Sequence, residues 1–149
     1  MTSTSTTIEI AAAPAAIFAL ASATPRWPLI LPHYRYVRVR ETDGARRIVA
    51  MSVWRDIFPL AWVAEQTDDS SRPHIAFRHV GGLTRGMEVE WTFTPAGERT
   101  RVSIVHRLDF ALPLLRLPPV KALVAGYFID GVARRTLARI KAIAERGEG

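Results

Sequence analysis

The sequence predicts an α+β fold in which a curved antiparallel sheet of about seven strands wraps around one long C-terminal helix. Residues 2–110 alternate between apolar and polar positions in several short runs, which is typical of strands with one buried face. Residues 120–146 change to helical periodicity, with apolar side chains along one broad side. A single large helix cannot cover both faces of such a sheet. We therefore expect the sheet to curve around the helix and to leave a cavity between them.

The clearest alternation lies in residues 86–110, which form two predicted strands joined by a turn at residues 95–97. One face of this hairpin is polar, and the other is wide and apolar. The apolar positions are Met87, Val89, Trp91, Phe93, Val102, Ile104, Leu108 and Phe110. His106 shares their face, although titratable side chains are uncommon at buried positions. We expect this hairpin to form one wall of the cavity.

The other predicted strands lie at residues 2–10, 34–42, 47–54, 60–67 and 74–80. The dipeptide Asp43-Gly44 marks a tight hairpin turn between two of them.

Prolines define the helical segments near the N-terminus. Two short segments are expected after the first strand, at residues 11–23 and 26–32. Pro14 suits a helix start, whereas Pro28 and Pro32 limit the second segment to one turn. In the long C-terminal helix, Gly126 and Gly131 lower the helix propensity and predict a bend or a close approach to a strand.

Length and composition limit the function classes. The 149 residues are expected to form a single domain spanning 1–149. The chain has no cysteine, which excludes disulfides, thiolate nucleophiles and thiolate metal sites. Its 20 basic and 14 acidic side chains give a net charge of +6, and arginine supplies most of the basic residues. We interpret these arginines mainly as solvated strand faces, so nucleic-acid binding is not the favoured function.

Residues 11–23 are similar to the apolar region of a signal peptide. No lysine or arginine precedes them, and Glu9 and Pro14 interrupt the apolar pattern. A secretory signal needs a basic start and an unbroken apolar run. No segment reaches transmembrane length. We therefore expect a cytoplasmic protein without a transmembrane segment.

The order of these elements and several short motifs resemble the SRPBCC superfamily, with its START / birch-pollen-allergen helix-grip fold. Within that superfamily they resemble the polyketide cyclase/dehydrase branch. The motifs are Trp27-Pro28, Leu31-Pro32, Tyr34 and residues 87–91, 100–102, 105–106, 133–137, 140–141 and 144–145. The resemblance spans nearly the whole chain. It implies a hydrophobic small molecule, aromatic or polyketide-like, held between the sheet and the C-terminal helix.

The resemblance also implies which side chains bind the ligand. Four positions match cavity-lining ones of aromatase/cyclases, two more are expected beside them, and His106 joins from the hairpin. The predicted ligand-binding residues are Trp27, Tyr34, Met87, Trp91, Trp62, Tyr127 and His106. Those enzymes resemble one another in an inward arginine on the fourth strand. This chain has none there and reads Trp62-Val63-Ala64-Glu65-Gln66 instead.

Aldol cyclisation of a polyketide requires a base for an acidic α-proton and a donor for the developing enolate. A histidine in an apolar cavity can be that base, because desolvation lowers its pKa and keeps it neutral. His106 is the catalytic candidate as base, and Tyr34 or Tyr127 is the candidate donor. The alternative is a structural His106 whose ring nitrogens bond to neighbours inside the sheet.

The other three histidines are weaker candidates. His79 shares a face with apolar residues of its strand, whereas His33 and His74 are expected to be solvated. The histidines are scattered and lack carboxylates at metal-ligand spacing, so we expect neither a metal site nor a cofactor.

Two further apolar features allow two interpretations each. Trp54, Trp62 and Trp91 lie on different predicted strands and form either an aromatic wall for a ligand or ordinary core. Residues 112–119 read LPLLRLPP and form either a lid or membrane-touching loop, or a connection buried against the helix.

Three functions remain open. The first is binding of a hydrophobic small molecule, with polyketide cyclase/dehydratase activity as an option. The second is a non-catalytic carrier of a lipid or quinone, in which case the chain is similar to the coenzyme-Q-binding members of the superfamily. The third is a ribosome or nucleic-acid interaction module that uses Arg38, Arg40, Arg46 and Arg47. A homodimer is also left open.

Overall fold

A computed structural model describes residues 3–147 of the chain. Its strands are β1 (Ser3–Ile10), β2 (Tyr34–Asp43), β3 (Arg46–Arg55), β4 (Phe58–Asp69), β5 (His74–Gly82), β6 (Glu88–Ala96) and β7 (Arg99–Arg107). Its helical elements are α1 (Pro14–Ser22), η1 (Thr24–Arg26), α2 (Trp27–Ile30), η2 (Pro113–Arg116), α3 (Pro118–Leu123), η3 (Val124–Asp130) and α4 (Gly131–Glu145).

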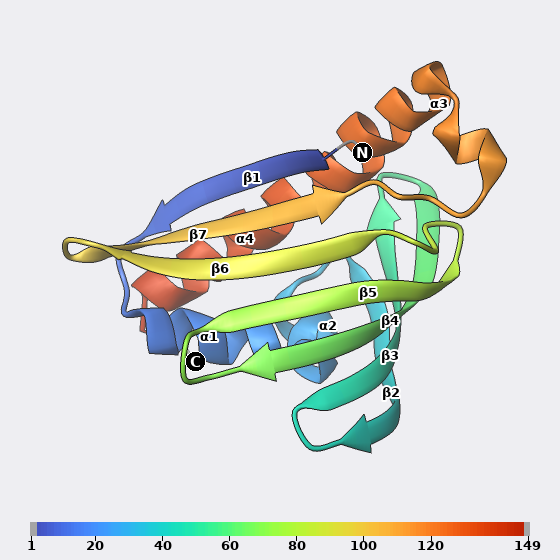
Figure 1. Ribbon diagram of the computed structural model, residues 1–149. Helices are drawn as coiled ribbons and strands as arrows, with labels where there is room; N and C mark the ends of the chain where they lie inside the picture. The colour runs from blue at the N-terminus through green and yellow to red at the C-terminus, as the bar shows by residue number, and fades with distance from the viewer. Residues whose placement is uncertain (1–2, 148–149) are drawn as a thin grey trace.

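The strands form one antiparallel sheet in the order β1-β7-β6-β5-β4-β3-β2. The sheet curves around the C-terminal helix, with α1 and α2 at one end of the molecule and α3 at the other (Figure 1). Buried hydrophobic side chains of the sheet and the helices form one core. The predicted helix-grip fold, with short helical segments after the first strand, is therefore confirmed. Within the described part of the chain, no helix is long and apolar enough to cross a membrane.

The hairpin predicted at residues 86–110 corresponds to β6 and β7. Trp91 pairs with Ile104, and Val89 pairs with His106. None of the predicted inward side chains exceeds 8% exposure. Gly97 closes the turn with a φ of +69°, which glycine adopts without a clash of Cβ. The alternation in the sequence therefore identified the buried face of this hairpin correctly.

Strand β4 begins two residues earlier than the sequence predicts, because it includes Phe58 and Pro59. Pro59 pairs with Trp54 of β3, whereas β5 reaches only as far as Trp62 on the other side. The N–H that proline lacks is therefore not needed by a second neighbour, and the strand can continue through it.

The long C-terminal helix predicted at residues 120–146 is present, and it is irregular in its middle, where the sequence predicts a bend or a close approach to a strand. It begins as α3, continues as the π-helical segment η3 and ends as α4. Gly131 follows η3 and lets Arg55 of β3 approach, since a Cβ there would lie 2.6 Å from the Arg55 Nε. That Nε donates a 2.7 Å hydrogen bond to the Tyr127 carbonyl oxygen. The expected close approach to a strand is confirmed at Gly131, and it holds a π-helical segment of a kind often found at functional sites.

Candidate functional site

A cavity lies between the inner face of the sheet and the segment η3–α4. The sheet contributes mainly Met51, Trp62, Phe77, Met87, Trp91 and Ile104, and the helix contributes Phe128, Ile129, Val132 and Ala133. Six of the seven predicted ligand-binding side chains line this cavity, and only Tyr127 does not. The aromatic and methionine side chains make its walls suited to an apolar ring system.

The polar groups of the cavity are few and uncharged. They belong to Tyr34, His79, Thr84, His106 and Thr136, and no aspartate, glutamate, lysine or arginine lines the space. The inward-facing side chains of the fourth strand are Trp62, Ala64 and Gln66. The strand therefore has no inward arginine, as the sequence indicates. An ionised ligand would lose its hydration without gaining a counter-charge, so the lining favours a neutral ligand.

The cavity is small in its present conformation. Its water-accessible volume is about 80 Å³, whereas sites for drug-sized ligands measure about 300–1,000 Å³. Four lining side chains are only half-buried, namely Leu60, Trp62, Phe128 and Val132. They define the mouth of the cavity, between the start of β4 and η3. Rotation of the two aromatic rings there would enlarge the space without unfolding the core.

Trp27 forms part of the cavity wall at the end opposite the mouth. Its ring centre lies 4.9 Å from that of Tyr34 and 6.0 Å from that of Trp91. Its indole Nε1 donates a 3.2 Å hydrogen bond to the Leu20 carbonyl oxygen. The helix α2 has only four residues, so its position depends on such tertiary contacts rather than on helix stability.

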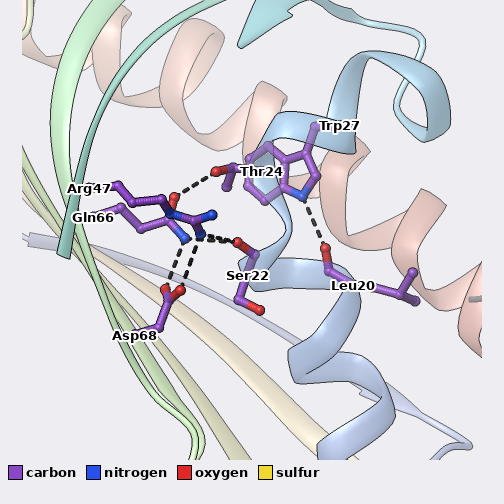
Figure 2. A network of polar contacts seen from close by, with 7 residues as sticks. All are labelled: Leu20, Ser22, Thr24, Trp27, Arg47, Gln66 and Asp68. Atoms are coloured by element: carbon purple, nitrogen blue, oxygen red, sulfur yellow. Dashed lines mark hydrogen bonds and ion pairs between the residues drawn. The ribbon is translucent and has the colours of Figure 1, made fainter. Parts of the chain in front are cut away.

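A buried polar network anchors the connection between α1 and α2 to the sheet (Figure 2). Gln66 of β4 accepts a 2.6 Å hydrogen bond from the Thr24 hydroxyl. Its Nε2 donates to the Ser22 carbonyl oxygen and to Asp68, both at 2.9 Å. Arg47 of β3 donates to the same two acceptors at 2.5 and 3.2 Å. Gln66 is fully buried outside the cavity lining, so its role is to hold the helical segments in place.

His106 lies on β7 and lines the cavity. Burial lowers its pKa from 6.5 to about 4, and the Asp130 carboxylate acts in the opposite direction. The imidazole is therefore neutral at pH 7. Its Nδ1 is buried without a hydrogen-bond partner among the described residues. Buried polar atoms are rarely left in that state, so the interpretation in which neighbours satisfy both ring nitrogens does not describe this histidine.

His79 lies in the same cavity and is held more firmly than His106. Its Nδ1 lies 2.8 Å from the Thr84 hydroxyl oxygen. Its ring stacks on Trp62, with centres 5.5 Å apart and planes 14° apart. Burial, followed by the charge of His106, lowers its pKa to about 3. The cavity thus contains two neutral imidazoles on neighbouring parts of the sheet.

Tyr34 supplies a hydroxyl group to the same cavity. Burial raises the pKa of this phenol, while a hydrogen bond with Thr136 opposes that rise. Thr136 lines the cavity from α4 and donates a 2.8 Å hydrogen bond to the Val132 carbonyl oxygen. The phenol therefore stays protonated at neutral pH. Because Thr136 donates its single proton to Val132, the Tyr34 hydroxyl donates to Thr136 in this structure, and it donates to a ligand oxygen by turning toward the cavity.

The prediction that His33 is solvated is wrong. His33 is 6% exposed, because the chain turns inward between α2 and β2. Its Nε2 lies 2.9 Å from the Thr136 hydroxyl oxygen, and burial followed by the charge of Arg135 lowers its pKa to about 4. His74, in contrast, is half-exposed as expected and lies 3.9 Å from Glu90.

Two predicted aromatic residues lie outside the cavity. Tyr127 points away from it on η3, and its hydroxyl donates a 2.5 Å hydrogen bond to Asp56. The π-helical geometry brings Phe128 to the cavity instead. Trp54 is 42% exposed on the outer face of β3, with the Arg35 guanidinium 4.8 Å from its ring centre. The proposed aromatic wall therefore consists of Trp62 and Trp91 without Trp54.

The sequence reasoning missed several lining residues. Met51 and Leu60 follow from strand alternation, so closer attention to β3 and β4 would have found them. Thr84 lies in a turn and Phe128 in a π-helical segment, and neither position carries a periodic signal. Thr136 was noted only as part of the motif at residues 133–137, and its burial at 1% exposure was not predicted.

The arginines named for nucleic-acid binding lie outside the cavity. No group of three potential metal ligands occurs in residues 3–147. Of the arginines proposed for nucleic acid, Arg46 pairs with Glu65 at 3.2 Å and Arg47 belongs to the buried network. The Arg38 guanidinium covers the Tyr36 ring at 4.3 Å.

Comparisons with known proteins match nearly the whole chain. The sequence profile of the family described as "Polyketide cyclase / dehydrase and lipid transport" matches residues 1–145. A granaticin polyketide synthase bifunctional cyclase/dehydratase from Streptomyces violaceoruber is 26% identical over 146 residues, which cover 95% of this chain. The chain spans only 43% of the length of that relative.

Solved structures share the fold. The Zhui aromatase/cyclase from Streptomyces sp. R1128 is 20% identical with a TM-score of 0.83, and the match covers 97% of this chain and 94% of that one. A START superfamily protein from Mycobacterium smegmatis is 17% identical with a TM-score of 0.73, covering 95% and 98% of the two chains.

Proposed function

Because the chain belongs to the polyketide cyclase / dehydrase and lipid transport family, we propose that it binds a hydrophobic, polyketide-like or aromatic molecule in this cavity. We further propose that it promotes cyclisation or dehydration of that molecule. The observation that carries the proposal is the neutral His106 imidazole, which has an unpartnered nitrogen inside an aromatic-lined and charge-free cavity. The relative from Streptomyces violaceoruber, described as a cyclase/dehydratase, supports the same class of reaction.

His106 would act as the general base. Its neutral imidazole takes an α-proton from a poly-β-keto chain, and the Tyr34 hydroxyl donates a hydrogen bond to the enolate oxygen. The enolate carbon then attacks a second carbonyl carbon of the chain, and the imidazolium returns its proton to the new alkoxide. For the loss of water, the neutral imidazole removes a second α-proton next to the new carbinol, and the resulting imidazolium gives that proton to the departing hydroxyl group. Asp130 favours the charged imidazole during these steps, since its carboxylate raises the pKa of His106.

The test compares His106→Ala with His74→Ala, because His74 is the half-exposed histidine outside the cavity. The substrate is a linear poly-β-keto thioester, and both product formation and binding are measured. We expect His106→Ala to lose product formation by about 10²–10⁴-fold, the usual contribution of a general base, while it still binds. Equal turnover by the two variants would remove His106 from the mechanism.

A non-catalytic carrier of a lipid or quinone is the second candidate. The absence of charge from the cavity lining favours it, because a carrier needs only apolar walls. Organic extraction of the purified protein, followed by mass spectrometry, would identify a co-purified lipophile. A tightly bound quinone or lipid that the protein leaves unchanged would replace the enzymatic proposal.

A further inference from the structure

Large hydrophobic side chains are exposed mainly at the mouth end of the molecule. Eleven such side chains are exposed within the described residues, and seven of them lie on the β3–β4 turn, the β5–β6 turn and residues 112–123. We name these seven the leucine patch: Ile57, Phe58, Leu83, Leu112, Leu114, Leu117 and Leu123. Scattered single exposures are normal on a protein surface, but a group confined to one end indicates an interaction site.

The backbone that carries the patch is held in place by contacts with the rest of the protein. Leu115 is buried at 3% exposure and anchors η2 to the core. The Arg116 Nε donates a 2.9 Å hydrogen bond to the Phe110 carbonyl oxygen. With Leu115 directed inward and the Arg116 side chain tied to the backbone, Leu114 and Leu117 are directed outward, at 63% and 51% exposure.

One segment of the patch reaches the mouth of the cavity, and the other two segments are joined to each other. The Phe58 ring centre lies 6.2 Å from that of Phe128, which belongs to the mouth. The Ala111 amide donates a 2.8 Å hydrogen bond to the Arg85 carbonyl oxygen, which joins the β5–β6 turn to the segment before η2. These turns and α3 lie at the same end of the molecule (Figure 1). A ligand that leaves the cavity therefore meets an apolar surface.

The charge around the patch is positive. The segments that carry the patch contain Arg85, Arg116 and Lys121, whereas the exposed Asp109 lies directly before them in the chain. On the β3–β4 turn, the carboxylate of Asp56 already accepts from Tyr127 and pairs with Arg55 at 3.5 Å. A second copy of the chain would bring two positive surfaces together, which disfavours a symmetric contact. An anionic lipid surface matches both the apolar and the basic character.

We propose that the leucine patch docks on an anionic lipid bilayer, with the mouth of the cavity facing the membrane. The leucines enter the boundary between headgroups and acyl chains, while the basic side chains contact lipid phosphates. A hydrophobic ligand then passes between membrane and cavity without crossing water. The docking stands independently of any catalysis in the cavity.

The test is sedimentation with vesicles of phosphatidylcholine, with and without phosphatidylglycerol. We expect the protein to bind the anionic vesicles, and the binding to weaken as salt is added. The double substitution Leu114→Glu and Leu117→Glu should lower the partition coefficient by about tenfold or more, because two apolar contacts are lost. The control is Leu29→Glu, which changes a leucine that is 82% exposed on α2, away from the patch.

Thermal unfolding of all three proteins verifies that the substitutions leave the fold intact. Failure of the wild-type protein to bind anionic vesicles would overturn the proposal. Equal binding by the patch variant and the Leu29 variant would also overturn it, because contact would then be made elsewhere. Size-exclusion chromatography tests whether the patch instead binds a second copy of the chain. A wild-type dimer that the patch substitutions convert to monomer would assign the patch to a second copy and contradict membrane docking. None of these outcomes bears on the proposed chemistry at His106.

Discussion

The two ends of the curved sheet differ in whether their buried polar groups have hydrogen-bond partners. At the end opposite the mouth, which we call the closed end, Gln66 and Arg47 join the helical segments to the sheet, and their hydrogen-bonding groups are matched by acceptors and donors. At the mouth end, the Nδ1 of His106 is buried without a partner in the described chain. The adjoining helix is π-helical there, and large apolar side chains are exposed.

This difference indicates that one end of the sheet maintains the fold and the other end is suited to bind a ligand. A buried polar network in which every member is satisfied makes its surroundings rigid and defines one conformation. A buried nitrogen without a partner costs stability. The Nδ1 of His33 is in the same state as that of His106, but only His106 lines the cavity, where a ligand can reach it. The closed end therefore fixes Trp27 and the geometry of the cavity. The mouth end keeps free the groups and the space that a ligand needs.

Acidification should give the largest effect, and it should act on the histidines rather than on the closed-end network. The folded-state pKa values of His33 and His106 are about 4 and that of His79 is about 3, against 6.5 in the unfolded chain. Between these values the unfolded state binds more protons, so the stability is highest above pH 6.5 and falls as the pH drops toward 4. We expect a loss of roughly 2–3 kcal/mol per histidine at about pH 4.5.

Urea unfolding at several pH values measures this loss. Relative to the wild-type protein, His106→Gln should flatten the pH dependence by the share of one histidine. A variant with the pH profile of the wild-type protein would mean that His106 is solvated, and the contrast between the two ends would fail.

Gln66→Ala should be the next largest effect. It removes the partner of the Thr24 hydroxyl and one donor to Ser22 and Asp68, so we expect a loss of about 2–3 kcal/mol. Thr84→Val is the matched change at the mouth end, where only the contact with His79 is lost, and it should cost about 1 kcal/mol. Chemical denaturation of the two variants compares them. Equal losses would contradict the idea that the closed end carries more of the polar stabilisation.

The sequence allowed prediction of most of the fold and of part of the site, and the division has a physical cause. Strand alternation places Met87, Trp91 and His106 on one buried face, because side chains in a strand alternate by rule. The inward turn of His33 and the π-helical segment at Tyr127 depend on tertiary contacts with Thr136 and Arg55. Such contacts join residues far apart in the chain, and local periodicity does not encode them.

Trp54 shows the same limit in a strand. The residue lies on β3 and was grouped with Trp62 and Trp91 by residue type alone. Its neighbour Val53 is fully buried, so the alternation places Trp54 outward, where Arg35 covers its ring. Trp54 was expected in the cavity because it is aromatic, but its position in the alternation of β3 directs it outward.

Arg55→Ala should have a moderate effect at the mouth end. The change removes the hydrogen bond to the Tyr127 carbonyl oxygen and the contact with the Tyr127 ring. We expect a loss of about 1–2 kcal/mol and faster amide hydrogen exchange in residues 124–130. Arg35→Ala is the control, since Arg35 covers Trp54 on the outer face. Unchanged exchange in residues 124–130 would show that the π-helical segment does not depend on Arg55.

Trp62→Ala should have the smallest effect on stability, about 1 kcal/mol, because this ring is half-buried at the mouth. It should enlarge the cavity and tighten the binding of a bulky aromatic probe. Trp91→Ala, in contrast, removes a ring that is 4% exposed and should cost about 3–5 kcal/mol. Calorimetric titration and thermal unfolding of both variants test the contrast. A larger stability loss for the Trp62 variant would show that the mouth is packed as firmly as the core.

The occupancy of the cavity is tested most directly by nuclear magnetic resonance with 2-naphthol as an aromatic probe. We expect saturable shifts of the imidazole signals of His106 and of the indole signals of Trp62 and Trp91, which line the cavity. The signals of His74 and Trp54, which lie outside it, should stay constant. Saturable shifts confined to Trp54 and His74, or none at His106, would contradict the assignment of this cavity as the ligand site.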